Sequence, residues 1–218
     1  MQTGEPVLAR VGGAAVFGEM RPEMASRVNE TMIAFYGREP AAVAEAYDFS
    51  GIRTLVDIGG GSGNLITTLL LANPALRGIV YDLPHAGPDA RRMIEARGVA
   101  DRCEVIGGSF FESVPGGADA YLLSHVINDW PEERCLAILR NVRRAVPPGG
   151  RLLVVEQVIT PGGESGRAKL LDLISLATTA GMHRRPDEHR ELMARAGFRM
   201  TRLVATREPV SIIEGEPV

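Results

Sequence analysis

Residues 54–64 read TLVDIGGGSGN, and the mostly apolar run LITTLLL follows at 65–71. A β-branched, apolar run that ends in a glycine cluster and then becomes apolar again predicts a strand, a tight turn and a helix N-terminus. Glycines at 59, 61 and 63 allow a sharp turn and let a ligand approach without a Cβ in the way. The free N–H groups and the dipole of the helix start favour a polar or anionic ligand there.

The glycine spacing distinguishes among nucleotide-binding turns. It is G-x-G-x-G, whereas the dinucleotide fingerprint needs a glycine at position 64, where Asn64 stands, and no G-K-[ST] of a phosphate loop is present. Asp82 closes the next apolar run, about 20 residues further on, where an acid meets a pair of ribose hydroxyls. A nucleoside without a pyrophosphate is therefore expected, and S-adenosylmethionine fits best. A nicotinamide-dependent oxidoreductase is disfavoured by the same spacing.

Composition sets the broad class. With 218 residues, 45% of them hydrophobic, the chain is expected to bury a full core. Its net charge of −3 offers no basic footprint for nucleic acid. Cys103 and Cys135 have neither metal-type spacing nor a disulfide framework, which suits a reducing cytoplasm. Neither a signal-peptide pattern nor a membrane-length apolar run is seen, so a cytoplasmic protein without a membrane partner is expected.

Strands and helices are predicted to alternate after an N-terminal helical part. Residues 1–20 are predicted to be a linker, with helices from 21 to about 36 and at 40–47. Strands are predicted at 53–58, 78–82, 103–107, 118–123, 151–156, 198–205 and 208–214, and helices at 62–72, 88–97, 132–146, 168–180 and 187–196. This alternation predicts a doubly wound α/β fold. Two regions are expected: residues 1–50, a linker and helical segment lining an acceptor pocket, and 51–218, the ligand-binding domain.

Polar residues gather where these strands end. Ligands of doubly wound sheets bind beyond the carboxyl ends of the strands, at the switch point beside the first strand. The polar residues at such ends are Asp57, Asp82, Ser109, the segment 124–130 and Glu156. Their agreement with the glycine turn predicts one site at this edge.

Five motifs in order carry a resemblance to a known family. They are VDIGGGSG at 56–63, YDLPH at 81–85, GGSFFE at 107–112, NDW at 128–130 and PPGGR at 147–151. Over about residues 15–215 the chain resembles the S-adenosylmethionine-dependent O-methyltransferases of the plant caffeic-acid and bacterial polyketide-tailoring type. The resemblance implies a Rossmann-like class I methyltransferase sheet, mainly parallel with an antiparallel C-terminal strand. It also implies methyl transfer to a hydroxyl of a small aromatic or polyketide-like substrate.

The family normally carries an extra N-terminal winged-helix domain that forms the dimer. This chain starts in what resembles the connection after that domain. A homodimer is therefore expected only if such a domain is present in the full protein.

The resemblance assigns the cofactor residues one by one. The methionine end is expected at Asp57 and the glycine turn, and the ribose hydroxyls at Asp82, with Leu83 beside it; the glycines are Gly59, Gly60, Gly61 and Gly63. Ser109 stands where the family usually has an acid that bonds the adenine amine, and Phe110 is expected to pack on the ring. Ser124 replaces a common lysine or arginine. Trp130 is expected near the adenine, or alternatively as a helix-capping aromatic in the core.

The catalytic position departs from the family's pattern. The family's general base is a histidine immediately before Asp-Trp, and here that residue is Asn128, whose neutral amide cannot accept a phenol's proton. Relatives hold that histidine between two glutamates; one corresponds to Glu156, and His183 stands at the position of the other. We hypothesise that His183 is the base, with Asn128 orienting the substrate oxygen and Glu156 holding Asn128 or polarising the site. The alternative is that His183 is an exposed loop histidine.

Several other possibilities stay open. His125 is expected to be structural, and His85 and His189 to lie in a turn and on a helix surface. No histidine pair with a carboxylate has metal-ligand spacing, so no metal is expected. Positioning alone can drive transfer from a reactive sulfonium, or the protein binds the cofactor without methylating. The expected acceptor-pocket residues are Met32, Phe35 or Tyr36, Leu173, Leu176, Thr178, Thr179 and Met182.

Overall fold

The computed structural model describes residues 22–159, 172–173, 175–176 and 181–218. Its order is α3 (Pro22–Tyr36), α4 (Glu39–Ala46), β1 (Thr54–Ile58), α5 (Asn64–Ala72), β2 (Arg77–Asp82), the 3-10 helix η1 (Pro84–Ala86), α6 (Gly87–Ala96), β3 (Cys103–Gly107), β4 (Ala120–Ser124), the 3-10 helix η2 (Ile127–Asp129), α7 (Glu132–Ala145), β5 (Arg151–Glu156), α9 (Pro186–Arg195), β6 (Phe198–Ala205) and β7 (Ser211–Pro217). The predicted linker at 1–20 lies outside the described residues, as does most of the predicted helix at 168–180. Residues 172, 173, 175 and 176 of that helix are helical.

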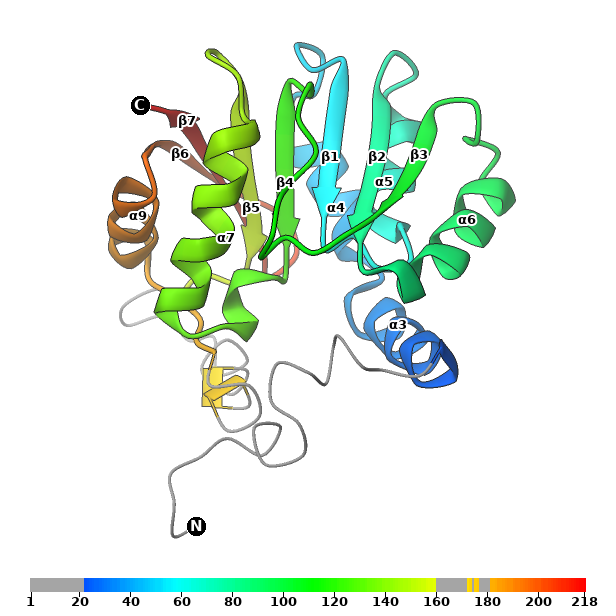
Figure 1. Ribbon diagram of the computed structural model, residues 1–218, viewed down its shortest axis with the longest axis horizontal. Helices are drawn as coiled ribbons and strands as arrows, with labels where there is room; N and C mark the ends of the chain where they lie inside the picture. Colours follow the sequence, from blue (N-terminus) through cyan, green and yellow to red (C-terminus); the bar gives the residue numbers. More distant parts are fainter. Residues whose placement is uncertain (1–21, 160–171, 174, 177–180) are drawn as a thin grey trace, which may run out of the picture.

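The seven strands form one sheet in the order β3-β2-β1-β4-β5-β7-β6 (Figure 1). The five strands from β3 to β5 are parallel, and β7 pairs antiparallel with both β5 and β6. The strand order reverses between β1 and β4, which makes their carboxyl ends the topological switch point. The predicted doubly wound, mainly parallel sheet with an antiparallel C-terminal end is confirmed.

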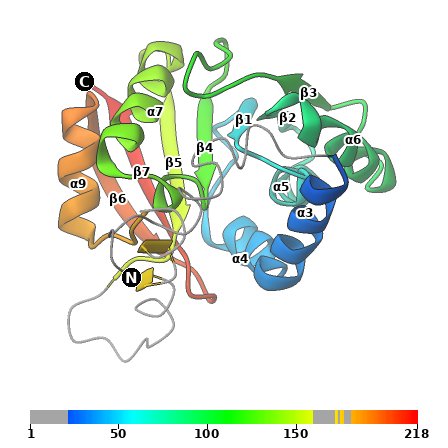
Figure 2. The same cartoon turned by 60° about the horizontal axis from the view of Figure 1, so that its bottom comes forward.

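Helices cover both faces of this sheet (Figure 2). Because successive strand residues point to opposite faces, Val56 and Ile58 pack on one side, in a core with residues of α7 and α9. Leu55 packs on the other side with Ile66 and Leu70 of α5 and with residues of α4 and α6. The near-continuous apolar strands are thus explained by burial on both faces.

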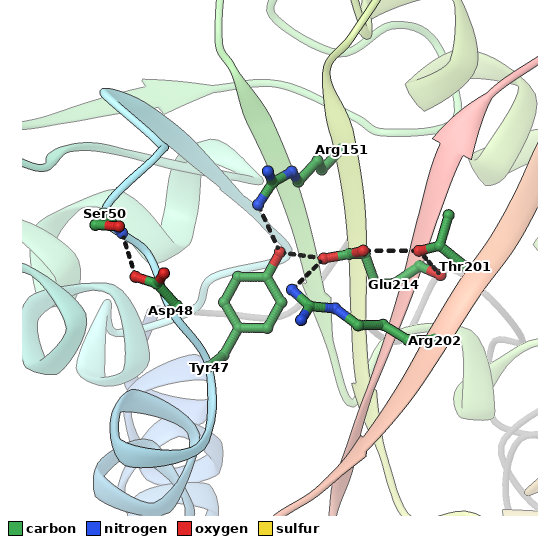
Figure 3. Close-up of polar contacts among 7 residues, drawn as sticks. All are labelled: Tyr47, Asp48, Ser50, Arg151, Thr201, Arg202 and Glu214. Atoms are coloured by element: carbon green, nitrogen blue, oxygen red, sulfur yellow. Dashed lines mark hydrogen bonds and ion pairs between the residues drawn. The ribbon is translucent and has the colours of Figure 1, made fainter.

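A polar cluster fixes the end of α4 to the C-terminal strands (Figure 3). The Tyr47 hydroxyl donates to Glu214 of β7 and accepts a bond of 3.3 Å from Arg151 of β5. Glu214 also accepts bonds of 2.8 Å from Arg202 and 2.7 Å from Thr201. Although burial raises it, the hydrogen bonds from Arg202, Tyr47 and Thr201 hold the pKa of Glu214 below its usual value. The cluster therefore anchors the helical segment to the sheet, at the edge opposite the carboxyl ends of the parallel strands.

At the carboxyl edge, α3 contacts η1, which follows β2 (Figure 1). This contact places α3 beside the switch point. Across the part of the chain that the structure describes, no helix is both long and apolar enough to cross a membrane.

Candidate active site

A cavity of about 290 Å³ opens at the carboxyl edge of the sheet. Its walls come from the glycine turn, the ends of β2 and β4, and the helices α3 and α4. The residues predicted for a cofactor that line it are Asp57, Gly59, Gly60, Gly61, Asp82, Leu83, Phe110, Ser124 and Trp130. Gly63 and Ser109 do not line it. Most of the predicted set is therefore brought together by the switch point.

The glycine turn forms because only glycine fits its backbone. Gly59, Gly61 and Gly63 have φ values of 70°, 54° and 74°, in the left-handed region that side chains disfavour. A Cβ at Gly60 would lie 2.9 Å from Oδ2 of Asp57. The turn is closed by the N–H of Gly63, which donates to the carbonyl of Gly60 over 2.8 Å. Gly63 thus helps to form the glycine turn although it does not itself line the cavity.

Asp82 joins this turn to the neighbouring strand. Its Oδ2 accepts a hydrogen bond of 2.7 Å from the N–H of Gly61, and its Oδ1 accepts one of 2.6 Å from the N–H of Leu83. Burial raises the pKa of Asp82 despite these two bonds. Each oxygen has a second lone pair, so the carboxylate can accept further hydrogen bonds from the cavity.

Asp57 places a buried carboxyl oxygen without a partner in the same wall. It is 2% exposed, and its Oδ2 has no hydrogen-bond partner among the described residues. Burial and the nearby charge of Asp82 raise its pKa to about 7. A buried carboxyl in this state is stabilised by a cationic group entering the cavity.

Aromatic rings form another part of the wall. The rings of Phe110 and Trp130 meet edge to face with centroids 6.2 Å apart. Trp130 is 8% exposed and belongs both to the cavity wall and to the hydrophobic core, so the two expectations for it are compatible. Oγ of Ser109 accepts the N–H of Phe111 over 3.3 Å, which is a local turn contact.

Asn128, Glu156 and His183 lie together behind the ends of β4 and β5, and all three are buried. The backbone N–H of Asn128 donates to Oε1 of Glu156 over 3.0 Å. Nδ1 of His183 lies 3.3 Å from the carbonyl oxygen of Gln157, the residue after Glu156. The loop before His183 touches Asn128 directly, since a Cβ at Gly181 would lie 1.9 Å from the Asn128 carbonyl oxygen. The alternative of an exposed loop histidine at 183 is wrong.

Burial shifts the titration of this cluster. It raises the pKa of Glu156 to about 7 and that of neighbouring Asp129 to about 6. It lowers the pKa of His183, which therefore favours the neutral imidazole. Within the described part of the chain, Oδ1 of Asn128, Oε2 of Glu156 and both amide atoms of Gln157 are buried without a hydrogen-bond partner. Groups of this kind suit a site that a polar ligand completes.

Sequence analysis misplaced one buried side chain, His189, and did not predict the burial of another, Arg184. His189 was expected on a helix surface but is fully buried, and burial lowers its pKa to about 3. It shares the buried face of α9 with Leu192 and Met193, and this i, i+3, i+4 spacing was the available signal. Arg184 is 2% exposed and donates to the carbonyl of Ile127 over 3.2 Å, so it braces the loop that carries Asn128. Nothing in the local pattern predicts its burial.

The residues expected around an acceptor divide into three groups. Met32 and Tyr36 line the cavity that contains the glycine turn. Leu173, Leu176 and Met182 are 62%, 57% and 40% exposed, and Phe35 is 48% exposed. Thr178 and Thr179 lie outside the described residues.

Comparisons with known proteins identify the family. Residues 4–199 match the O-methyltransferase domain model, and the chain belongs to this O-methyltransferase family. It is 39% identical over 220 residues to a phenazine O-methyltransferase of Lysobacter antibioticus, covering 100% of this chain and 64% of that protein. It is 41% identical over 159 residues to an aclacinomycin 10-hydroxylase of Streptomyces purpurascens, covering 72% of this chain and 42% of that one.

A comparison with a solved structure also points to the O-methyltransferase family. The O-methyltransferase NcsB1 from neocarzinostatin biosynthesis, in complex with S-adenosylmethionine and 2-hydroxy-5-methyl naphthoic acid, is 33% identical with a TM-score of 0.89. The match covers 100% of this chain and 65% of that one. The chain thus spans less than two thirds of the length of these three relatives.

Proposed function

We propose that this chain binds S-adenosylmethionine and transfers its methyl group to a hydroxyl of a small aromatic or polyketide-like molecule. One observation carries the proposal: a buried carboxyl oxygen without a partner among the described residues, Oδ2 of Asp57, stands beside the glycine turn in the wall of the cavity. The methionine part of the cofactor offers this carboxyl a cation and needs the space that the glycines leave. The bound cofactor supplies a reactive methyl group on a sulfonium.

The ribose and adenine have fitting partners in the same wall. Asp82 keeps lone pairs for two hydroxyls while its bonds to the backbone of Gly61 and Leu83 hold it in place. Phe110 and Trp130 offer ring edges and faces to a flat base. Ser109 is left with a turn-forming role. Ser124 and Leu83 line the wall between these parts.

We assign the proton acceptor to His183. A hydrogen bond from Nδ1–H to the Gln157 carbonyl leaves the lone pair on Nε2, and burial keeps the ring neutral near pH 7. The acceptor hydroxyl would give its proton to Nε2, and its oxygen would bond the methyl carbon while the carbon–sulfur bond breaks and its electron pair stays on the sulfur. Asn128 orients that oxygen through its amide, while Glu156 holds the backbone of Asn128. Positioning of the two reactants supplies much of the remaining acceleration.

The acceptor is expected between the cavity and the segment before His183. Met32 and Tyr36, which line the cavity, are proposed to bound it on one side, and Leu173, Leu176 and Met182 on the other; Thr178 and Thr179 stay an expectation from the sequence. Methionine and aromatic side chains suit a flat ring system. The phenazine and naphthoic acid named for the relatives are ligands of this kind. A homodimer is proposed only for a full protein that carries an N-terminal dimerisation domain.

A second function has its own support. Asn128 replaces the usual base, and one relative at 41% identity is named a hydroxylase. The second candidate is therefore a protein that binds the cofactor and tailors a small molecule without methylating it.

Two measurements test these proposals. Calorimetric titration with S-adenosylhomocysteine should show binding, NAD should not bind, and Asp82→Ala should abolish binding while the circular dichroism spectrum stays unchanged. Mass spectrometry of reactions with hydroxynaphthoic and hydroxyphenazine acceptors should then show a gain of one methyl group. His183→Ala should lower turnover by about 10²-fold or more, whereas Arg190→Ala, on the exposed face of α9, should not. Cofactor binding without methylation of any acceptor favours the second function.

A further inference from the structure

A buried contact between His125 and Glu39 joins two walls of the cavity. Nε2 of His125 lies 2.6 Å from Oε2 of Glu39, and the side chains are only 14% and 8% exposed. Glu39 is the first residue of α4, whereas His125 follows the last residue of β4, 86 positions further along the chain. Both residues line the cavity that contains the glycine turn. The contact therefore spans from the helical wall to the sheet.

The helix before α4 holds the same imidazole. The ring of Tyr36, the last residue of α3, stacks on His125 with centroids 3.9 Å apart and planes 19° from parallel. Tyr36 also lines the cavity. His125 thus contacts both ends of the α3–α4 junction, one through an ionisable pair and one through a ring face.

The backbone of His125 is held in an uncommon conformation. Its φ is 52°, the one positive value at a non-glycine position among the described residues. Its N–H still donates to the carbonyl of Val155 over 3.1 Å, so the residue remains fixed to β5. A left-handed non-glycine residue is strained and persists only where its surroundings determine it, often at a functional site.

We propose that His125 is a positioning residue: through Glu39 and Tyr36 it ties the α3–α4 segment to the end of β4 and so holds the helical wall over a bound cofactor. The identity of that ligand rests on the proposed function. Loss of the pair leaves the glycine turn, Asp57 and His183 in place but releases one wall of the cavity. A wall that is no longer tied to the sheet holds a bound ligand less firmly, and such a change acts mainly on the dissociation rate.

Three single variants separate this role from a general loss of stability. Glu39→Ala and His125→Asn each remove the pair, and asparagine tolerates the left-handed backbone of position 125. The matched control is Glu45→Ala, which removes an ion pair from the same helix: Glu45 lies 2.7 Å from Arg207, and both side chains are 58% exposed. Glu45 does not line the cavity.

The first readout is the fluorescence of Trp130, the chain's single tryptophan, which lines the cavity. Stopped-flow mixing with S-adenosylhomocysteine should show dissociation about tenfold faster in both variants, with association within about twofold of the wild type. The double variant should be no worse than either single one, because both remove the same interaction. The control should match the wild type. Unchanged dissociation rates, or effects that add in the double variant, overturn the proposal.

The second readout needs no ligand. Hydrogen exchange followed by mass spectrometry should show faster exchange over residues 22–46 in Glu39→Ala and His125→Asn, and unchanged exchange in Glu45→Ala. Exchange equal to that of the wild type in both variants overturns the proposal. If the wild type does not bind S-adenosylhomocysteine, the proposed function fails, and the exchange result still decides whether this pair ties the helices to the sheet.

Discussion

Glu156 shows how one residue links burial to charge. Its carboxyl is fully buried, one oxygen accepts the N–H of Asn128, and the other has no partner among the described residues. Burial raises its pKa from 4.5 to about 7. Ionisation of Glu156 therefore lowers the stability of the folded protein, a cost that proteins accept mainly at functional sites.

Glu156→Gln is expected to stabilise the ligand-free protein at high pH. Because the folded pKa is raised, the wild type loses stability as the pH rises from about 4.5 to about 7, and below 4.5 the group is protonated in both states. The variant keeps an acceptor for Asn128 and should be more stable by up to about 3 kcal/mol at pH 8. Urea unfolding at pH 4, 6 and 8 measures this. An equal difference at pH 4 and pH 8 would contradict the assignment.

The bounds of a strand or helix were predicted well where the residues of that element alone determine them. β3 and β5 have the predicted bounds, 103–107 and 151–156. A short apolar run between turn residues favours a buried strand, and the turn residues mark both of its ends. β7 starts at Ser211 rather than at 208, after Pro209, which has no N–H to donate to a ladder. Its register is set by pairing with β5, where Ser211 faces Glu156. That partner lies far away in the sequence.

The anchor between α4 and the C-terminal strands gives a prediction about stability. Tyr47→Phe removes the hydroxyl that donates to Glu214 and accepts from Arg151 (Figure 3). Since Glu214 keeps Arg202 and Thr201 as donors, the loss should be about 1–2 kcal/mol in urea unfolding. Ser50→Ala is the control: it keeps the backbone N–H that donates to Asp48, and both residues are exposed, so the loss of the Ser50 hydroxyl should stay within about 0.5 kcal/mol.

The contact between the loops that carry Asn128 and His183 gives a second prediction at this scale. Gly181→Ala places a Cβ 1.9 Å from the carbonyl oxygen of Asn128, so the loop before His183 has to move. We expect a loss of about 1–3 kcal/mol and a fall in methyl transfer that exceeds the fall in cofactor affinity. Gly116→Ala is the control, since its Cβ meets no atom within 4 Å. Equal melting temperatures and turnover for the two variants would show that the loops do not need this contact.

At the scale of the whole molecule, the fold collects acidic groups around one cavity. Glu39, Asp57, Asp82 and Asp129 come from different elements and all line it. In the sequence they are scattered among 27 acidic residues in a chain with a net charge of only −3. The topology therefore creates a local negative site that the overall charge does not reveal.

This arrangement predicts that cofactor binding releases a proton. Burial raises the pKa of Asp57 to about 7, and a bound cation favours its ionised form. Calorimetry at pH 6.5 in buffers of different ionisation enthalpy should show release of about half a proton or more, falling to nearly none at pH 8.5. In Asp57→Asn the release should disappear. Uptake of a proton at pH 6.5, or release that persists in the variant, would show that another group is responsible.

The sequence by itself determined the sheet, the glycine turn and the positions of Asp57 and Asp82, because local periodicity and glycine spacing encode strand ends and turns. It also placed Asn128, Glu156 and His183 in one cluster through family resemblance, although their roles remain predictions. Only the tertiary structure decided that His189 and Arg184 are buried and that Glu39 meets His125. Such contacts join residues far apart in the chain, and their burial and geometry depend on how whole elements pack rather than on any local pattern.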